Sequence, residues 1–292
     1  MKKYHSIGSL FADYRAFNEL SQNEFAHLLD VDLRTVQRWE KDLTLIKSEK
    51  EEDIVLNTLM PYQLIHNLNA AVPIPTYYDL RLRKYSTSDM ANGLPHANWF
   101  RDQIEVRSER LRPIDVDFDM KYLKRFIESQ QRDEHFLNEE LIKEAVRLLP
   151  ELNLILTTSS GYYSSHCVIL PLKEEAYHKL RNKELTKKEL RASDLTDPKH
   201  LEKQYYFNYD STADSNDNAY YLLAAFLRFF RQLSEMEYLF ATISERQDGY
   251  LLNQQVGLQV IWEDLERQQA LGWDFPPRFI EGNYKKFLTR FD

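Results

Sequence analysis

Hydrogen-bond donors gather in one short segment near the start of the chain. Arg34, Gln37 and Arg38 lie close together there. An arginine can donate two hydrogen bonds to the edge of guanine, and a glutamine can form a matching pair with adenine. If Val36 and Trp39 face inward from a helix, the three donors lie on its outer arc. Such a layout, with apolar anchors beneath donors, is suited to contacts with base edges in the major groove.

Two short helices joined by a tight turn are predicted to position these donors. Ser21 and Glu24 form a capping-box pattern at the start of one helix, and Asp32 can cap the next. Apolar residues recur at helical spacing over 7–17 and again over 54–68. We therefore expect the start of the chain to be a small bundle of packed helices.

From Ile7 to Glu40 the sequence resembles the Cro/C1-type (XRE-like) helix-turn-helix family. The resemblance runs without a gap through "LSQNEFAHLLDVD" and "TVQRWE". It implies a compact helical domain whose third helix enters the major groove of double-stranded DNA, usually as a homodimer on paired half-sites. Where the family usually has glycine in the turn between the second and third helices, this chain has Asp30, a residue type that tolerates a left-handed backbone. Lys41 and Asp42 stand where Asn-Gly is often found.

The resemblance also implies roles for particular residues of the third helix. Three of them, Leu33, Arg34 and Arg38, fall at positions that face the bases. Two others, Thr35 and Gln37, fall nearer to the DNA backbone.

Phosphate contacts are expected to contribute modestly. Gln22 would hold a phosphate with help from the N-terminus of its helix, and Lys41 could contact a neighbouring phosphate. However, residues 1–70 contain 8 Lys and Arg against 11 Asp and Glu, and the whole chain has a formal net charge of −8. Sequence-independent affinity for DNA should therefore be weak and sensitive to salt.

The amino-acid composition limits which other kinds of functional site the chain can contain. The single cysteine, Cys167, excludes an intramolecular disulfide and a zinc site with several cysteines. Only 7 glycines occur, which leaves little room for a glycine-rich phosphate loop. We expect no cofactor and no metal. Because no apolar run is long enough for a signal peptide or a membrane span, we expect a cytoplasmic protein with no membrane partner.

The chain divides into three parts by composition. Residues 1–70 form the predicted helix-turn-helix domain. Residues 71–113 are punctuated by Pro, Gly and Asn and are locally basic, which is typical of a connector with some packed aromatics. Residues 114–292 are predicted to be one α/β or α+β domain.

The third part alternates between strand and helix patterns. A helical stretch over 121–149 precedes two apolar runs around a Ser-Ser-Gly turn, which predicts a hairpin. The elements expected after it are a long charged helix over 173–191, strands at 205–209, 238–244 and 258–262, and helices over 219–233 and 249–256. This alternation predicts parallel or mixed strand pairing.

The stretch "LLNQQVGLQVIW", from Leu251 to Trp262, resembles the end of the GNAT acetyltransferase fold, where a helix leads into the next strand. The preceding order of strands and helices also fits, most firmly over residues 150–275. The predicted fold class is therefore multidomain: an all-α helix-turn-helix bundle followed by an α/β GNAT-like domain with a mixed sheet.

The chemistry of the GNAT family is not matched in this chain. Active members bind the pyrophosphate of coenzyme A at a turn that corresponds to "DSTADSNDN", but this turn has neither glycine nor cation. Asp210, Asp214 and Asp217 would repel a pyrophosphate, and we expect Asp217 to cap the following helix. Asn253 stands where the family often has a tyrosine general acid. We therefore expect this domain to dimerise or to bind an unknown small-molecule effector.

Two further clusters were considered for chemistry. His166 and Cys167 are adjacent on a predicted strand, so they point to opposite faces and cannot form a nucleophile–base pair. We expect Cys167 to be buried. If extended, the motif "DVDFD" would place Asp115, Asp117 and Asp119 on one face of a strand, and an exposed edge or loop is expected there rather than an acid–base or metal site.

Three hypotheses for function follow. The first is a DNA-binding transcriptional regulator with a GNAT-like sensor or dimerisation domain. The alternative is an N-acyltransferase with a divergent acyl donor and a regulatory helix-turn-helix. The third is a protein-interaction module whose helix-turn-helix docks on a partner.

Overall fold

The computed structural model describes residues 1–88, 94–129, 137–233 and 235–291. Its first part is a bundle of short helices, as predicted. The bounds of these helices are α1 (Ile7–Phe17), α2 (Gln22–Leu28), α3 (Leu33–Glu40), α4 (Ser48–Thr58) and α5 (Tyr62–Leu68).

The turn and cap chemistry of this bundle is what the sequence predicts. Ser21 Oγ accepts from the Glu24 amide at 3.2 Å, and Glu24 Oε2 accepts from the Ser21 amide at 2.8 Å, which completes the capping box. Asp32 caps α3 by accepting from the Thr35 amide at 2.9 Å. Asp30 adopts a φ of 50°, the left-handed backbone that the turn requires in place of glycine.

The core of the bundle forms around the inner face of α3. Val36 and Trp39 are buried, and Trp39 packs edge-on against Phe11 with ring centroids 6.1 Å apart. Phe11 in turn packs against Phe25 at 5.2 Å. Aromatic contacts therefore join α1, α2 and α3 into one unit.

The described residues of the segment 71–113, expected to be a connector, include the regular elements β2 (Thr76–Asp79), β3 (Lys84–Ser86), α6 (Ala97–Glu105) and β4 (Leu111–Pro113). Strand β2 lies between β3 and the short β1 (Lys2–Tyr4) in an antiparallel three-stranded sheet. The sequence gives no signal for β1, because its partner lies more than seventy residues away along the chain.

A seven-stranded sheet forms from β4, which lies in the segment expected to be a connector, and six strands that follow it along the chain; its mixed pairing is as predicted. The strands lie in the order β4-β5-β6-β7-β8-β10-β9, and every pairing is antiparallel except β7 with β8. The bounds of the remaining strands are β5 (Leu154–Thr157), β6 (Tyr163–Leu172), β7 (Lys203–Ala213), β8 (Glu237–Ser244), β9 (Gln259–Glu263) and β10 (Arg278–Gly282).

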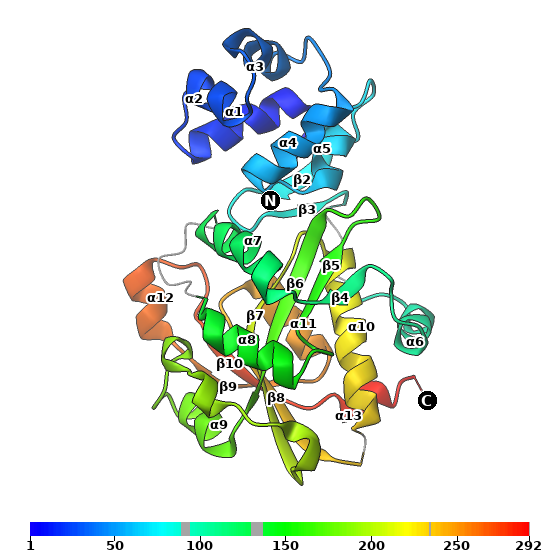
Figure 1. The fold of residues 1–292 in the computed structure, drawn as a ribbon, viewed down its shortest axis with the longest axis vertical. Coiled ribbons are helices and arrows are strands. Elements are labelled where there is room, and N and C mark those ends of the chain that lie inside the picture. The colour runs from blue at the N-terminus through cyan, green and yellow to red at the C-terminus, as the bar shows by residue number, and fades with distance from the viewer. Residues whose placement is uncertain (89–93, 130–136, 234, 292) are drawn as a thin grey trace.

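Helices cover both faces of this sheet (Figure 1). One apolar core joins the sheet to α6, α10 and α13, and a second core joins the opposite face to α7, α8 and α9. The bounds are α7 (Val116–Ser129), α8 (Glu139–Leu148), α9 (Glu174–Arg181), α10 (Asn216–Gln232), α11 (Gln247–Gln255), α12 (Leu265–Leu271) and α13 (Lys285–Leu288). No helix in the described ranges is both long and apolar enough to cross a bilayer.

Two predicted elements are wrong in detail. The charged helix over 173–191 stops at Arg181, because Lys183 turns left-handed with a φ of 61° and Thr186 with Glu189 caps a separate 3-10 turn. The "DVDFD" segment, expected to be an exposed edge or loop, is mostly helical: Asp115 precedes α7, and residues 116–119 begin it. Asp119 is buried there and forms two hydrogen bonds with Arg112, at 2.6 and 2.7 Å.

The acidic turn before α10 also differs from the expectation. Strand β7 continues to Ala213, so Asp210 belongs to a strand and not to a loop. The N-cap of α10 is Ser215, which accepts from the Asn218 amide at 3.3 Å, and Asp217 lies in the first turn of the helix. A serine cap fits because the buried hydroxyl can satisfy a backbone donor without placing a second charge in the core.

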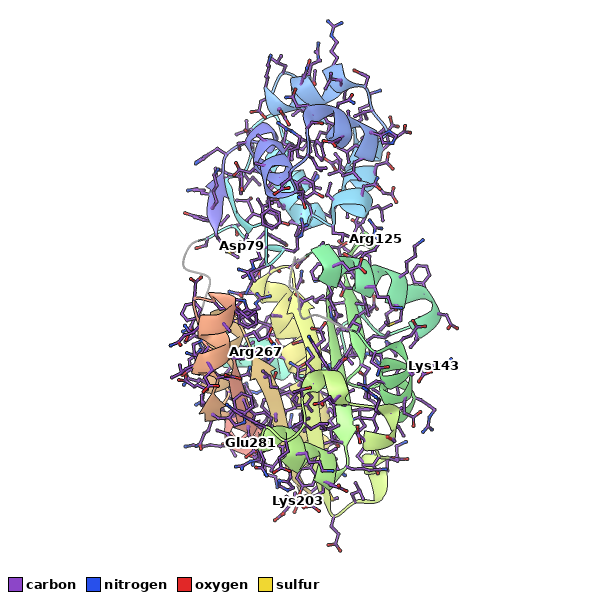
Figure 2. The ribbon with its side chains drawn as sticks, turned by 90° about the vertical axis from the view of Figure 1, so that its left-hand side faces the viewer. Asp79, Arg125, Lys143, Lys203, Arg267 and Glu281 are labelled. Carbon is purple, nitrogen blue, oxygen red and sulfur yellow. The ribbon has the colours of Figure 1, made fainter. Side chains whose placement is uncertain are left out.

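The helical bundle rests on one end of the large sheet. Tyr62 of α5 stacks on Tyr162, next to the start of β6, with ring centroids 4.5 Å apart. Arg125 of α7 donates to the Leu56 carbonyl of α4 at 3.0 Å. Arg125 and Asp79 are labelled in Figure 2, where the bundle meets the rest of the molecule.

Candidate functional site

The outer face of α3 carries the side chains predicted to contact DNA. Arg34, Arg38 and Lys41 are exposed, and Leu33 is 39 % exposed. Within the described part of the chain, no hydrogen bond or ion pair engages the side chains of Arg34 and Arg38. The helix lies at the end of the molecule away from the large sheet (Figure 1), so these donors are open to solvent.

Two of the predicted contacts are engaged within the bundle. Gln22 donates to Glu40 Oε2 at 2.6 Å and accepts from Gln37 at 3.4 Å. Glu40 also accepts from Arg15, at 2.5 Å from Nε and 3.1 Å from Nη2. This network ties α1, α2 and α3 together, and it fixes the angle at which α3 is presented.

Thr35, the remaining predicted contact, belongs to the cap of its own helix. Its hydroxyl donates to Asp32 Oδ2 at 2.7 Å. The structure thus brings all the predicted side chains onto or beside α3, but among them only the two arginines are both exposed and equipped with free donors suited to base edges.

A second candidate site lies where β7 and β8 part. These parallel strands are paired as far as Asn208 and Thr242, although β7 continues to Ala213 and β8 to Ser244. The opening is part of a cavity of about 840 Å³. Cavities of this size hold small organic molecules in many proteins.

A buried histidine supports the wall of this cavity. His166 is fully buried, and its Nε2 lies 2.6 Å from Oδ2 of Asp210, a residue that lines the cavity. Its Nδ1 is hydrogen-bonded to the Tyr163 hydroxyl. Burial raises the pKa of Tyr163 well above its ordinary value, so this hydroxyl stays protonated and can donate to the ring. Asp210 is thereby held in place by a Tyr–His pair.

The N-terminal part of the chain also contributes to the cavity. Lys84 of β3 lines it and lies with Nζ 2.5 Å from Asp248 Oδ2 at the start of α11. Arg246 donates to both carboxylate oxygens of Asp248, at 3.0 and 2.6 Å. Burial raises the pKa of Asp248, but Arg246 and Lys84 outweigh this effect and hold the pKa below its ordinary value. The ion pair between Lys84 and Asp248 therefore joins the three-stranded sheet to the domain that contains the large sheet.

The acidic turn before α10 is closed by the same strand. The Tyr85 amide of β3 donates to the Asp214 carbonyl at 2.7 Å. The Asp214 side chain is buried and accepts from Asn218 Nδ2 at 2.7 Å, and Arg110 donates to Asn218 Oδ1 at 2.7 Å. Asn253, at the position of the expected tyrosine, donates to the Gly249 carbonyl at 2.8 Å.

Asp214→Asn is expected to stabilise the protein at neutral pH. Burial raises the pKa of Asp214 to about 6. The folded state therefore prefers the protonated Asp214 side chain. Protonation of Asp214 contributes fully to the free energy of unfolding below the pKa of the unfolded state, near 4. This contribution is lost as the pH rises through 6. Asparagine keeps the acceptor for Asn218 without the charge. Urea unfolding at pH 7 should show a gain of roughly 1–3 kcal/mol.

The difference in free energy of unfolding between Asp214→Asn and the unmodified protein should shrink as the pH falls from 7 to 4. Asp217→Asn is the matched control, because Asp217 is exposed in the first turn of the same helix. A difference for Asp214→Asn that stays constant over this pH range would contradict the assignment.

Comparisons with known proteins add little to this description. No protein-family model matches the chain, and no curated protein matches it either. Among solved structures, the chain is similar to an acetyltransferase of the GNAT family from Streptococcus agalactiae 2603, with 10 % sequence identity and a TM-score of 0.26, over 65 % of this chain and 92 % of that chain. The strand order and the single parallel pair, β7 with β8, define the fold of this sheet.

Sequence reasoning missed the pairs of residues, far apart along the chain, that form or support the wall of the cavity. His166 and Asp210 are 44 residues apart, and Lys84 and Asp248 are 164 apart. The available signal was a polar residue in an otherwise apolar strand, as His166 is in "SHCVILPL". Such a residue needs a partner when it is buried, although the sequence does not indicate which one. In the described ranges no group of three His, Cys, Asp or Glu side chains is placed to hold a metal. Cys167 is buried, as predicted.

Proposed function

We propose that the chain is a sequence-specific DNA-binding regulator in which α3 enters the major groove. The observation that carries this proposal is the outer face of α3. Arg34 and Arg38 are exposed and have no partner in the described part of the chain, while Val36 and Trp39 anchor the same helix in the core. Solvent-exposed guanidinium groups on a fixed helix are suited to bidentate contacts with guanine.

The ties within the bundle support a rigid, preorganised helix. Glu40 is bound by Arg15 and Gln22, so α3 loses little freedom when it docks. Gln22 would have to leave Glu40 in order to hold a phosphate. Direct base contacts by Arg34 and Arg38 therefore carry more of the proposal than phosphate contacts do.

A homodimer on paired half-sites is part of the proposal. A bundle with 8 Lys and Arg against 11 Asp and Glu attracts a polyanion weakly. Two copies bound side by side would raise the affinity without adding basic charge, because the second contact becomes intramolecular.

The test is selection of the full chain on random double-stranded DNA, followed by footprinting. The expected result is an enriched motif with two related half-sites and a protected stretch that spans both. Absence of any enriched motif would overturn the proposal. Salt-independent capture of a protein instead of DNA would favour the interaction module in its place.

The N-acyltransferase alternative has one observation in its favour, which is the cavity between β7 and β8. The closed turn at Asp214 and the amide at Asn253 oppose it. Calorimetric titration with acetyl-CoA separates the two proposals: saturable binding followed by acyl transfer to an amine would support the enzyme.

A further inference from the structure

One rim of the cavity carries lysines on aromatic walls. Lys183 Nζ lies 4.5 Å from the ring centroid of Trp262, and Lys187 Nζ lies 4.9 Å from the ring centroid of Tyr209. Both lysines and both rings line the cavity. The rings hold the ammonium groups in place, yet a cation over a ring face keeps donors free for an acceptor.

The carboxylates that line the cavity already have donors inside the protein. Asp210 is bound by His166, and Asp248 by Lys84 and Arg246. The other two are bound by a single residue: Glu245 accepts from Arg267 Nη2 at 3.3 Å, and Asp264 accepts from the Arg267 amide at 3.1 Å.

Lys183 and Lys187 differ from these groups. Within the described ranges neither has a carboxylate partner. Lys188 adds a third ammonium group to the same rim. The uncompensated charge at this end of the cavity is therefore positive.

The opposite side of the cavity is apolar. Its walls come from α10, β8 and α11, and the side chains include Leu222, Leu223, Phe226, Phe240 and Leu252. A volume of about 840 Å³ leaves room for a molecule that fills this region and still reaches the lysines.

We propose that the cavity binds an organic anion with an apolar body. Its carboxylate or phosphate lies at the rim beside Lys183 and Lys187, and its body lies among the side chains of α10 and β8. A cationic ligand does not fit this charge pattern, because the carboxylates that line the cavity, Asp210 among them, already accept hydrogen bonds within the protein. The inference stands whether or not α3 binds DNA.

Binding is measured by calorimetry on the full chain without DNA, using four probes of equal chain length. Octanoate and octyl phosphate are expected to bind saturably, and comparing their affinities shows whether the site prefers a carboxylate or a phosphate. Octylammonium and octanol should bind at least tenfold more weakly. The affinity of the anions should rise as the salt concentration falls. Equal binding of octanol would show apolar partition only and would overturn the proposal, as would no binding by either anion.

The double variant Lys183→Gln/Lys187→Gln removes both charges and keeps similar side-chain length. Octanoate affinity should fall roughly threefold to tenfold, since partly exposed ion pairs are of modest strength. Lys203→Gln is the matched control: its Nζ also lies over an aromatic ring, 5.4 Å from the centroid of Tyr205. Lys203 lies at an end of the molecule in Figure 2 and does not line the cavity. An unchanged affinity in the double variant, or an equal loss in Lys203→Gln, would refute the site.

Discussion

Replacing Arg34 and Arg38 by alanine is expected to remove the sequence preference of the protein for DNA. Each guanidinium group is exposed on α3 and has no partner in the described part of the chain. Loss of a bidentate contact with a base costs roughly 1–3 kcal/mol. Each single variant should therefore bind the selected site about 5- to 150-fold more weakly.

The loss of affinity should depend on the DNA sequence, because removing a base contact and removing a phosphate contact have different effects. Removing a base contact weakens the selected site and leaves binding to random DNA almost unchanged, whereas removing a phosphate contact weakens both alike. Gel-shift titrations of each variant against the selected site, single-base variants of it and random duplex measure this difference. The base position at which discrimination relaxes identifies the partner of each arginine.

Arg147→Ala is the control for the loss of positive charge. Arg147 is exposed on α8, where it pairs with Glu144 at 2.6 Å, and α8 packs on the large sheet and not on the bundle. Its removal should leave DNA affinity within about twofold of the original at fixed salt. If Arg147→Ala weakens binding as much as the α3 variants do, the contribution of α3 is only bulk charge and the base contacts do not exist.

The sequence predicts the helical bundle well because its rules act within a few residues. The Ser21–Glu24 capping box and the left-handed Asp30 each follow from neighbours along the chain. The inward face of α3 follows from one turn of helical spacing, which places Val36 and Trp39 together. Each of these predictions depends only on residues a few positions apart, so it requires no knowledge of long-range contacts.

The cavity could not be predicted in the same way, because its polar groups come from distant segments. The spacing within the sequence does not pair Lys84 with Asp248 or His166 with Asp210. Local rules also fail where a tertiary contact overrides them. The sequence favours an exposed edge or loop for Asp119, but this residue is buried in the first turn of α7, where its carboxylate accepts two hydrogen bonds from Arg112.

Gly8→Ala is expected to have the largest effect on the stability of the bundle. A Cβ at this position would lie 2.5 Å from the backbone oxygen of Glu40 and 2.7 Å from that of Trp39. Both are main-chain atoms at the end of α3 and cannot rotate away. In addition, the Gly8 amide donates to Asp42 Oδ1 at 2.9 Å, which fixes α1 against the turn after α3.

Alanine would normally favour a helix over glycine by about 1 kcal/mol. Here the overlap should reverse that sign, because α1 and α3 must separate to admit the methyl group, and overpacking of this kind costs roughly 1–3 kcal/mol or more. Hydrogen exchange on the full chain reports the change locally. Amides of α1 and α3 should exchange faster, while those of β6 and β7 in the large sheet should keep their protection.

Gly249→Ala provides the matched comparison, since Gly249 is also helical and its added Cβ would meet only the Ser244 side-chain oxygen, at 3.3 Å. That hydroxyl can shift, so the cost should stay within about 1 kcal/mol. Because Gly8 sets the position of α3, Gly8→Ala should also weaken binding to the selected DNA site with Arg34 and Arg38 intact. Unchanged exchange in α1 and α3 would mean that the two helices are not held by this contact, and the rigid presentation of α3 would then need another cause.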